Sequence, residues 1–113
     1  MKTQQDIIQS IEEKRQQYID AALDIWDYAE PIFEEYNVNY AYLFGSYAKG
    51  KAKETSDIDI LVSMPLNGLA FYELAERLRE SLKKKIDLLD ESQLENNTLL
   101  VKEILQDGIK IYG

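Results

Sequence analysis

Residues 57–63 constrain the fold more than any other stretch of this sequence. Aliphatic side chains alternate there with a second set that begins with two carboxylates, Asp57 and Asp59. A period of two sends the two sets to opposite faces of a β-strand. The chain must therefore build a sheet with an apolar face for Ile58, Ile60 and Val62. Both aspartates then project from the other face.

The remaining hydrophobic pattern places helices and further strands around this one. Apolar residues recur at helical spacing through the first 36 residues, and Pro31 predicts a kink or a break because the residue before a proline disfavours helical backbone. The predicted strands cover residues 40–44, 57–63, 86–89 and 109–112, and the later helices cover 69–84 and 95–106. The predicted apolar positions of these two helices are Tyr72, Ala75, Leu78 and Leu82 in the first and Leu99, Leu100, Ile104 and Leu105 in the second. Residues 45–55 predict a turn with at most a short helix. This order predicts an α/β or α+β domain with a mixed sheet.

Length and the absence of long apolar runs predict a single domain. The chain has 113 residues, and domains usually have about 100–150 residues around one core. No apolar run approaches the roughly 20 residues that span a bilayer, and the chain begins with polar residues. We therefore expect no membrane anchor, no secretory signal and a cytoplasmic location.

Composition narrows the chemistry available to the chain. The sequence has no cysteine and no histidine, which excludes disulfides, thiolate zinc sites, thiol nucleophiles and a Ser-His-Asp triad. Any bound metal must have oxygen ligands, as Mg²⁺, Mn²⁺ and Ca²⁺ prefer. With 13 basic against 21 acidic residues the net charge is −8. Direct nucleic-acid binding is not expected, because its affinity comes from clustered Lys and Arg.

Two interpretations of the aspartate pair are open. Close carboxylates repel, and a divalent cation removes that conflict; the alternative is an edge strand with solvated aspartates. Neighbouring residues favour the cation. Gly45-Ser46 follows directly on a predicted strand, where a glycine admits a ligand to the backbone and a hydroxyl can hold phosphate oxygens. Asp87 lies between aliphatic neighbours and needs a partner if it is buried.

Two lysine clusters lie beside these acids in the sequence. They contain six of the 13 basic residues: Lys49, Lys51, Lys53, Lys83, Lys84 and Lys85. Positive charge beside an acidic metal site suits a polyphosphate. The alternative is a solvated loop and a helix C-terminus, where cations are favoured in any case.

Taken together, these motifs resemble a known signature. Gly45-Ser46, then ten residues, then Asp57-Ile58-Asp59 is similar to the signature of the nucleotidyltransferase superfamily that includes DNA polymerase beta. The segments LFGSYAKG (43–50) and SDIDILV (56–62) resemble the minimal nucleotidyltransferase (MNT) domains of prokaryotes. Lys49 stands where many members have Arg. The lysine keeps the positive charge but cannot bind a phosphate through two parallel hydrogen bonds as Arg does. The resemblance implies a nucleotidyltransferase fold, a small mixed sheet flanked by helices, as one domain over residues 1–113.

The resemblance also implies an activity and its residues. Members transfer a nucleoside monophosphate from a nucleoside triphosphate to a hydroxyl and release pyrophosphate. Asp57, Asp59 and Asp87 would be both the catalytic residues and the metal ligands, for two Mg²⁺ ions or Mn²⁺ in their place. Asp87 would complete the second metal site and help to deprotonate the acceptor. The implied nucleotide-binding residues are Gly45, Ser46, Lys49 and Ser56.

A protein acceptor is the leading implication of the resemblance to MNT domains. Such domains are antitoxins that pair with HEPN ribonuclease toxins, and active ones add AMP to a tyrosine of the toxin. We therefore expect an ATP-using adenylyltransferase that AMPylates and neutralises a HEPN toxin. Two alternatives are kept: a catalytically silent MNT-fold antitoxin that acts by contact only, and a nucleotidyltransferase with a small-molecule acceptor. Another nucleoside triphosphate and a homo-oligomer are also open.

The N-terminal stretch looks longer than a minimal domain requires. We divide the chain into a helical extension, residues 1–19, and a core, residues 20–113. Residues 1–36 carry nine acids and three bases. We predict that this stretch anchors a basic partner through an apolar stripe flanked by acids; packing on the domain's own sheet and pairing in a homodimer are the alternatives. The stripe contains Ile7, Ile8, Ile11 and Tyr18.

Overall fold

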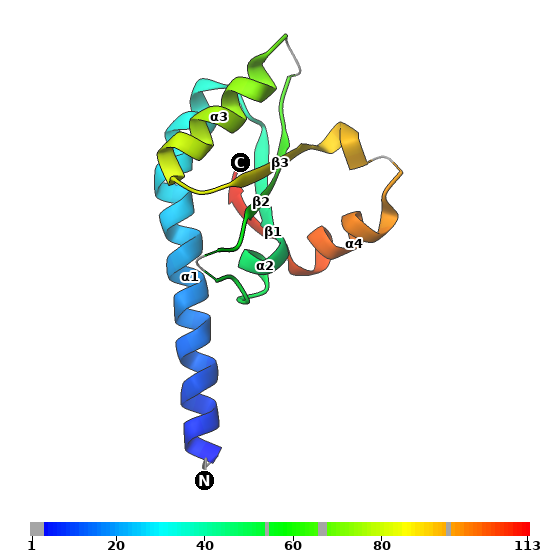
Figure 1. The fold of residues 1–113 in the computed structure, drawn as a ribbon. Coiled ribbons are helices and arrows are strands. Elements are labelled where there is room, and N and C mark those ends of the chain that lie inside the picture. The colour runs from blue at the N-terminus through cyan, green and yellow to red at the C-terminus, as the bar shows by residue number, and fades with distance from the viewer. Residues whose placement is uncertain (1–3, 54, 66–67, 95) are drawn as a thin grey trace.

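The described part of the chain contains four strands, four α-helices and one short 3-10 helix, arranged as Figure 1 shows. The structure is a computed structural model that describes residues 4–53, 55–65, 68–94 and 96–113. The side chains at positions 7, 8 and 10–22 lie outside the described part, and with them the stripe proposed for partner binding. The elements are α1 (Gln4–Glu35), β1 (Tyr40–Phe44), α2 (Gly45–Ala48), β2 (Ile58–Ser63), α3 (Ala70–Leu82), β3 (Ile86–Asp90), the 3-10 helix η1 (Glu91–Leu94), α4 (Thr98–Asp107) and β4 (Ile109–Tyr112).

The strands form one mixed sheet in the order β3-β2-β1-β4. β1 pairs antiparallel with β2 and with β4, whereas β2 and β3 are parallel. A parallel pair needs a long crossover, and α3 supplies it. The predicted mixed sheet and the predicted element order are therefore confirmed.

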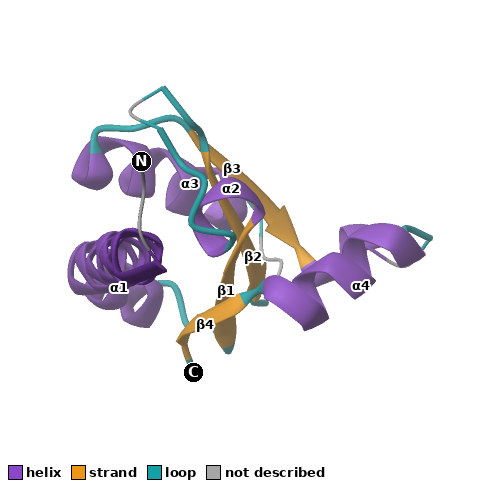
Figure 2. Cartoon of the chain, turned by 90° about the horizontal axis from the view of Figure 1, so that it is seen from below, coloured by secondary structure: helices purple, strands orange, loops and turns teal. Residues whose placement is uncertain are grey.

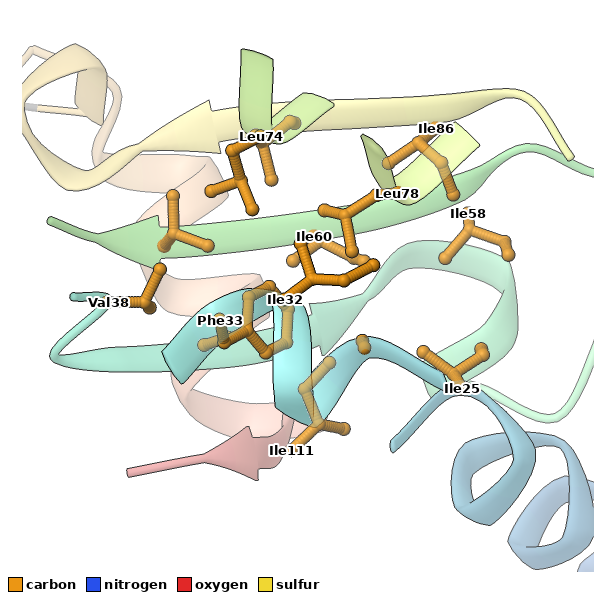
Figure 3. Packing of buried hydrophobic residues seen from close by; sticks show 14 of the residues in the cluster. Ile25, Ile32, Phe33, Val38, Ile58, Ile60, Leu74, Leu78, Ile86 and Ile111 are labelled. Atoms are coloured by element: carbon orange, nitrogen blue, oxygen red, sulfur yellow. The ribbon is translucent and has the colours of Figure 1, made fainter. Parts of the chain in front are cut away.

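The main core fills the space between one face of the sheet and the helices α1 and α3 (Figure 3). Ile58, Ile60 and Val62 of β2 point to this side and are at most 1% exposed, as their alternation with the aspartates predicted. Phe33 of α1 and Leu74 of α3 are fully buried against them. Because α1 and α3 cover only this face, they do not bury Asp59, which lies on the other face of the sheet.

α4 lies on the opposite side of the sheet from α1 and α3 (Figure 2). Its Ile104 packs with Phe44, Leu61 and Leu94 in a second, smaller cluster. Through Phe44, the last residue of β1, this cluster reaches the turn into α2. It therefore fixes α4 beside the turn that holds Gly45 and Ser46.

Several predictions about the helices need correction. No break occurs at Pro31: α1 continues to Glu35, because burial of Ile32 and Phe33 outweighs one missing backbone hydrogen bond. Tyr72, predicted to face the core, is 68% exposed, because the buried face of α3 is centred on Leu74, Ala75 and Leu78.

In α4, Leu99 and Leu105 are 79% and 77% exposed, although the sequence pattern counted both as apolar positions of the helix. Helical spacing turns only the face with Ile104 toward the sheet. The helix begins at Thr98 rather than at residue 95, and η1 precedes it without having been predicted.

α1 spans 32 residues and extends well past the sheet toward the N-terminus (Figure 1). The helix ends before Asn37, whose φ of +56° leaves the right-handed helical region. The division into an extension and a core at residue 19 stays a prediction. Within the described residues, no helix is both long and apolar enough to cross a membrane.

Candidate active site

Parallel pairing of β2 and β3 brings two of the predicted aspartates together. Asp59 lies in β2 and Asp87 in β3, and the two are register partners. Neighbours in register on adjacent strands point to the same face of a sheet, so both carboxylates lie on the α4 side. Asp57 stands just before β2, and its Oδ2 lies 3.7 Å from Nζ of Lys85. All three acids therefore meet at one end of the β2–β3 pair.

The surroundings of Asp59 shift the pKa of its carboxyl group. Partial burial, then the charge of Asp87 and a hydrogen bond with it, raise the pKa of Asp59 to about 6. The charges of Asp57 and Glu103 add to this rise. A carboxyl whose pKa is raised by other carboxyls lies where negative charge accumulates. Such a place attracts a cation.

Gly45 makes room for that carboxylate. A Cβ at position 45 would lie 2.2 Å from Oδ2 of Asp59, far inside contact distance. The backbone of Gly45 also has φ of +70°, which side chains other than glycine rarely allow. Phe44, the residue before it, is the register partner of Asp59. The turn that opens α2 is therefore pressed against the acidic side chain, and Ser46 comes next in it.

The two predicted phosphate-side residues beyond this turn already have partners. Nζ of Lys49 donates to Oε1 of Glu103 over 2.7 Å, and this contact raises the pKa of Lys49. Oγ of Ser56 accepts from the backbone N–H of Lys53 over 2.8 Å and closes the turn before β2. Ser56 therefore has a role in the loop itself, and Lys49 is tied to α4.

The second lysine cluster divides among different neighbours. Lys85 faces Asp57, and Nζ of Lys84 lies 5.8 Å from the centroid of the Tyr47 ring in α2. Lys83 ends α3 with a left-handed backbone conformation. Of these three lysines, Lys85 therefore fits the predicted place beside the acids best.

Glu103 belongs to this site and was not among the predicted residues. It is half-buried on α4, contacts Lys49 and acts electrostatically on Asp59. In the sequence it is one of 21 acids, in a helical segment more than 40 residues after Asp59. Its only sequence signal is its place directly before Ile104, a residue of the buried helix face.

The donor set suits a hard divalent cation. Asp57, Asp59 and Asp87 offer carboxylate oxygens only, which Mg²⁺ and Mn²⁺ prefer. Among the described residues, no three acidic side chains already stand in an arrangement that would enclose a metal ion. Without a cation these carboxylates repel one another, and beside burial the charges of Asp87 and Asp57 contribute to the raised pKa of Asp59. The residues therefore fit a cation by chemistry and by charge.

The sequence profile of the polymerase beta nucleotidyltransferase family matches residues 28–113, which is most of the chain. The chain belongs to this family. The profile includes every predicted site residue and leaves out most of α1. Dependence on a divalent metal is general in the polymerase beta nucleotidyltransferase family.

Individual members of the nucleotidyltransferase family sharpen the comparison. MJ1217 of Methanocaldococcus jannaschii, a predicted protein adenylyltransferase, is 40% identical over 80 residues, or 69% of this chain and 81% of that protein. The protein adenylyltransferase MntA of Thermococcus cleftensis is 36% identical over 80 residues, or 69% of this chain and 79% of that protein. Both comparisons cover most of the relative, so this chain is similar to nearly whole proteins of that kind.

A solved structure extends the likeness to the fold. It is described as a tri-AMPylated Shewanella oneidensis HEPN toxin in complex with MNT antitoxin. A chain in it superimposes with a TM-score of 0.61 at 26% identity, over 81% of this chain and 72% of that chain. The predicted nucleotidyltransferase fold is thereby confirmed.

Proposed function

We propose that this protein is an adenylyltransferase antitoxin that transfers AMP from ATP to a HEPN ribonuclease toxin. The observation that carries the proposal is the meeting of Asp59, Asp87 and Gly45 at one corner of the sheet, with the glycine pressed against a carboxylate. A protein that acted by contact alone would have no need of this arrangement. The comparison with MntA adenylyltransferases and with an AMPylated toxin complex supports the choice of nucleotide and acceptor.

Each site residue receives a role in this proposal. Asp57 and Asp59 would hold a divalent metal, Mg²⁺ or Mn²⁺, and Asp87 would complete a second metal position. A metal bound there would supply positive charge to offset the charge of the phosphates. Gly45 and Ser46 bind the phosphates through the turn at the start of α2, and Lys49 contacts them from the end of α2. Ser56 keeps the loop before β2 in place for the nucleotide.

The transfer itself is a substitution at the α-phosphorus. The hydroxyl oxygen of the acceptor tyrosine forms a bond to the α-phosphorus, and the bond from that phosphorus to the bridging oxygen breaks. Pyrophosphate leaves with the bonding electrons, and the tyrosine proton passes to the Asp87 carboxylate. Phosphoryl-type transfer depends mainly on positioning and on stabilising charge, so the chain needs no histidine for it. A cytoplasmic location belongs to the proposal, because the reaction needs ATP.

The alternatives differ in what they require of the aspartates. A silent antitoxin that works by contact would neutralise its toxin equally well with Asp59 replaced. A nucleotidyltransferase with a small-molecule acceptor would need the aspartates and leave the toxin unlabelled. Neither alternative has an observation in its favour that matches the Asp59–Gly45 arrangement.

The test combines a partner toxin with α-labelled ATP. The purified protein is incubated with a purified HEPN ribonuclease from its own organism, labelled ATP and Mg²⁺. We expect label on the toxin with the wild type and none with Asp59→Asn or Asp87→Asn. Glu80→Gln, which changes an exposed acid of α3, is the control and should label normally. Toxin neutralised without label by every variant would favour the silent antitoxin.

A further inference from the structure

One ion pair connects the predicted phosphate-binding turn to α4. Nζ of Lys49 lies 2.7 Å from Oε1 of Glu103, with side chains that are 38% and 33% exposed. Lys49 ends α2, and its backbone N–H donates to the carbonyl of Gly45 over 3.1 Å. Its main chain is therefore fixed beside Gly45, and the direction of its side chain depends on Glu103.

The position of Glu103 is set by the packing of α4. Its neighbour Ile104 is buried in the cluster that contains Phe44, the residue directly before Gly45. The side chain of Asn97 caps the start of the helix by accepting from the N–H of Leu100 over 3.1 Å. A helix anchored at its start and at its centre holds Glu103 toward the acidic site. The site acids and Lys49 thus face a fourth carboxylate that comes from a different element.

Glu103 and the phosphates of a nucleotide would both bind the ammonium group of Lys49. A triphosphate carries more negative charge than one carboxylate, so it is the stronger partner for Lys49. The ion pair is partly exposed, and such pairs are weak enough to exchange partners. Once Lys49 turns to the phosphates, Glu103 stands unpaired near a polyanion, and like charges repel. Both effects act against nucleotide binding.

We propose that Glu103 is a positioning residue that competes with the nucleotide's phosphates for Lys49. In the free protein, Glu103 binds the ammonium group of Lys49. This ammonium group moves to the phosphates when the nucleotide binds and returns to Glu103 when pyrophosphate leaves. The proposal rests on the nucleotide site of the proposed function. It assigns to α4 a part in setting nucleotide affinity and product release.

Binding titrations test this exchange directly. The probes are MgATP and magnesium tripolyphosphate, which share the phosphates and differ in the nucleoside. Glu103→Gln should bind both probes about three- to tenfold more tightly than the wild type, because it removes a competitor and one negative charge. In a Lys49→Met background the same change should raise affinity by a clearly smaller factor than in the wild type, because only the removal of one negative charge remains and the competition needs the ammonium group.

Two matched variants separate this exchange from general charge effects. Asp107→Asn removes a carboxylate one helical turn after Glu103 that also acts on Lys49, and it leaves the ion pair in place. Glu35→Gln breaks the ion pair between Glu35 of α1 and Arg77 of α3, whose charged atoms are 2.6 Å apart. This pair is exposed to a similar degree. Both should change the affinity for either probe by less than about twofold.

Turnover gives a second readout that a merely structural role would not move. Glu103→Gln should lower the KM for ATP without raising kcat, because tighter phosphate contacts also slow the departure of pyrophosphate. Unchanged or weaker binding of both probes by Glu103→Gln would overturn the competition, while the nucleotide site would stand. A wild-type protein that binds neither probe would overturn the site and the competition together.

Discussion

Replacing Asp59 by Asn should stabilise the metal-free protein at neutral pH. Burial and the neighbouring carboxylates raise the pKa of Asp59 from its ordinary 3.8 to about 6. A raised carboxyl pKa means that the folded state binds the proton more tightly than the unfolded state does. Stability is therefore lost as pH rises from about 4 to about 6, and it stays reduced above that range. Asn carries no charge and escapes this loss.

The size of the effect follows from the pKa shift. One pKa unit corresponds to about 1.36 kcal/mol, so the full shift is worth at most about 3 kcal/mol. The carboxylate is only partly buried, and solvent screening reduces this to about 1–2 kcal/mol. For a domain of this size the melting temperature should rise by about 4 °C per kcal/mol. The advantage of the variant should fall to about a third of its full value by pH 4.5.

The assay is thermal unfolding in EDTA from pH 4.5 to 7.5, with Asp27→Asn as the control. Asp27 is an exposed aspartate of α1, and its replacement should change little at any pH. An Asp59→Asn protein that is less stable than the wild type at pH 7.5 would refute the reasoning. The carboxylate would then satisfy structural hydrogen bonds rather than wait for a cation.

Three further predictions address packing and the N-terminal helix. Gly45→Ala should cost more than about 1–2 kcal/mol and abolish MgATP binding, because its Cβ meets the Asp59 carboxylate and its φ is positive; a normal melting temperature would contradict this. Ile104→Ala should cost about 2–4 kcal/mol in denaturant unfolding and Leu105→Ala less than about 0.5, since one is buried and the other 77% exposed; equal losses would contradict the described orientation of α4. Deletion of residues 1–17 should leave the melting temperature and the oligomeric state, measured as mass in solution, unchanged and should abolish pull-down of the toxin. Lost stability, with pull-down retained by the protein that still folds, would refute a role in partner binding.

The strands were predictable from the sequence because their patterns are short and unambiguous. The alternation in β2 placed Ile58 and Ile60 in the core, and the structure confirms it. The aromatic and apolar run of β1 was predicted with the observed bounds. Helix faces were harder, since Tyr72 and Leu105 fit an apolar pattern and still face solvent. A helical pattern shows which residues are apolar, and only the packing against the sheet selects the buried face.

The candidate site was predictable to the extent that it lies in local motifs. Gly45 and Asp59 stand in recognisable segments, but their close contact depends on the pairing of β1 with β2. The register of Asp59 with Asp87 depends likewise on a crossover through α3. Glu103 could not be predicted, because its place beside Lys49 follows from the burial of Ile104 against the face of the sheet that α4 covers. Such long-range placement has no local sequence pattern.

Transfer of AMP to a protein partner is the central claim, and one measurement tests it most directly. A purified HEPN ribonuclease from the same organism is incubated with the protein, ATP and Mg²⁺, and its intact mass is then recorded. We predict a toxin heavier by whole AMP groups, bound at tyrosine, with the wild type. We predict an unmodified toxin with Asp59→Asn or with EDTA present. A toxin of unchanged mass that is nevertheless neutralised by the wild-type protein would contradict the account.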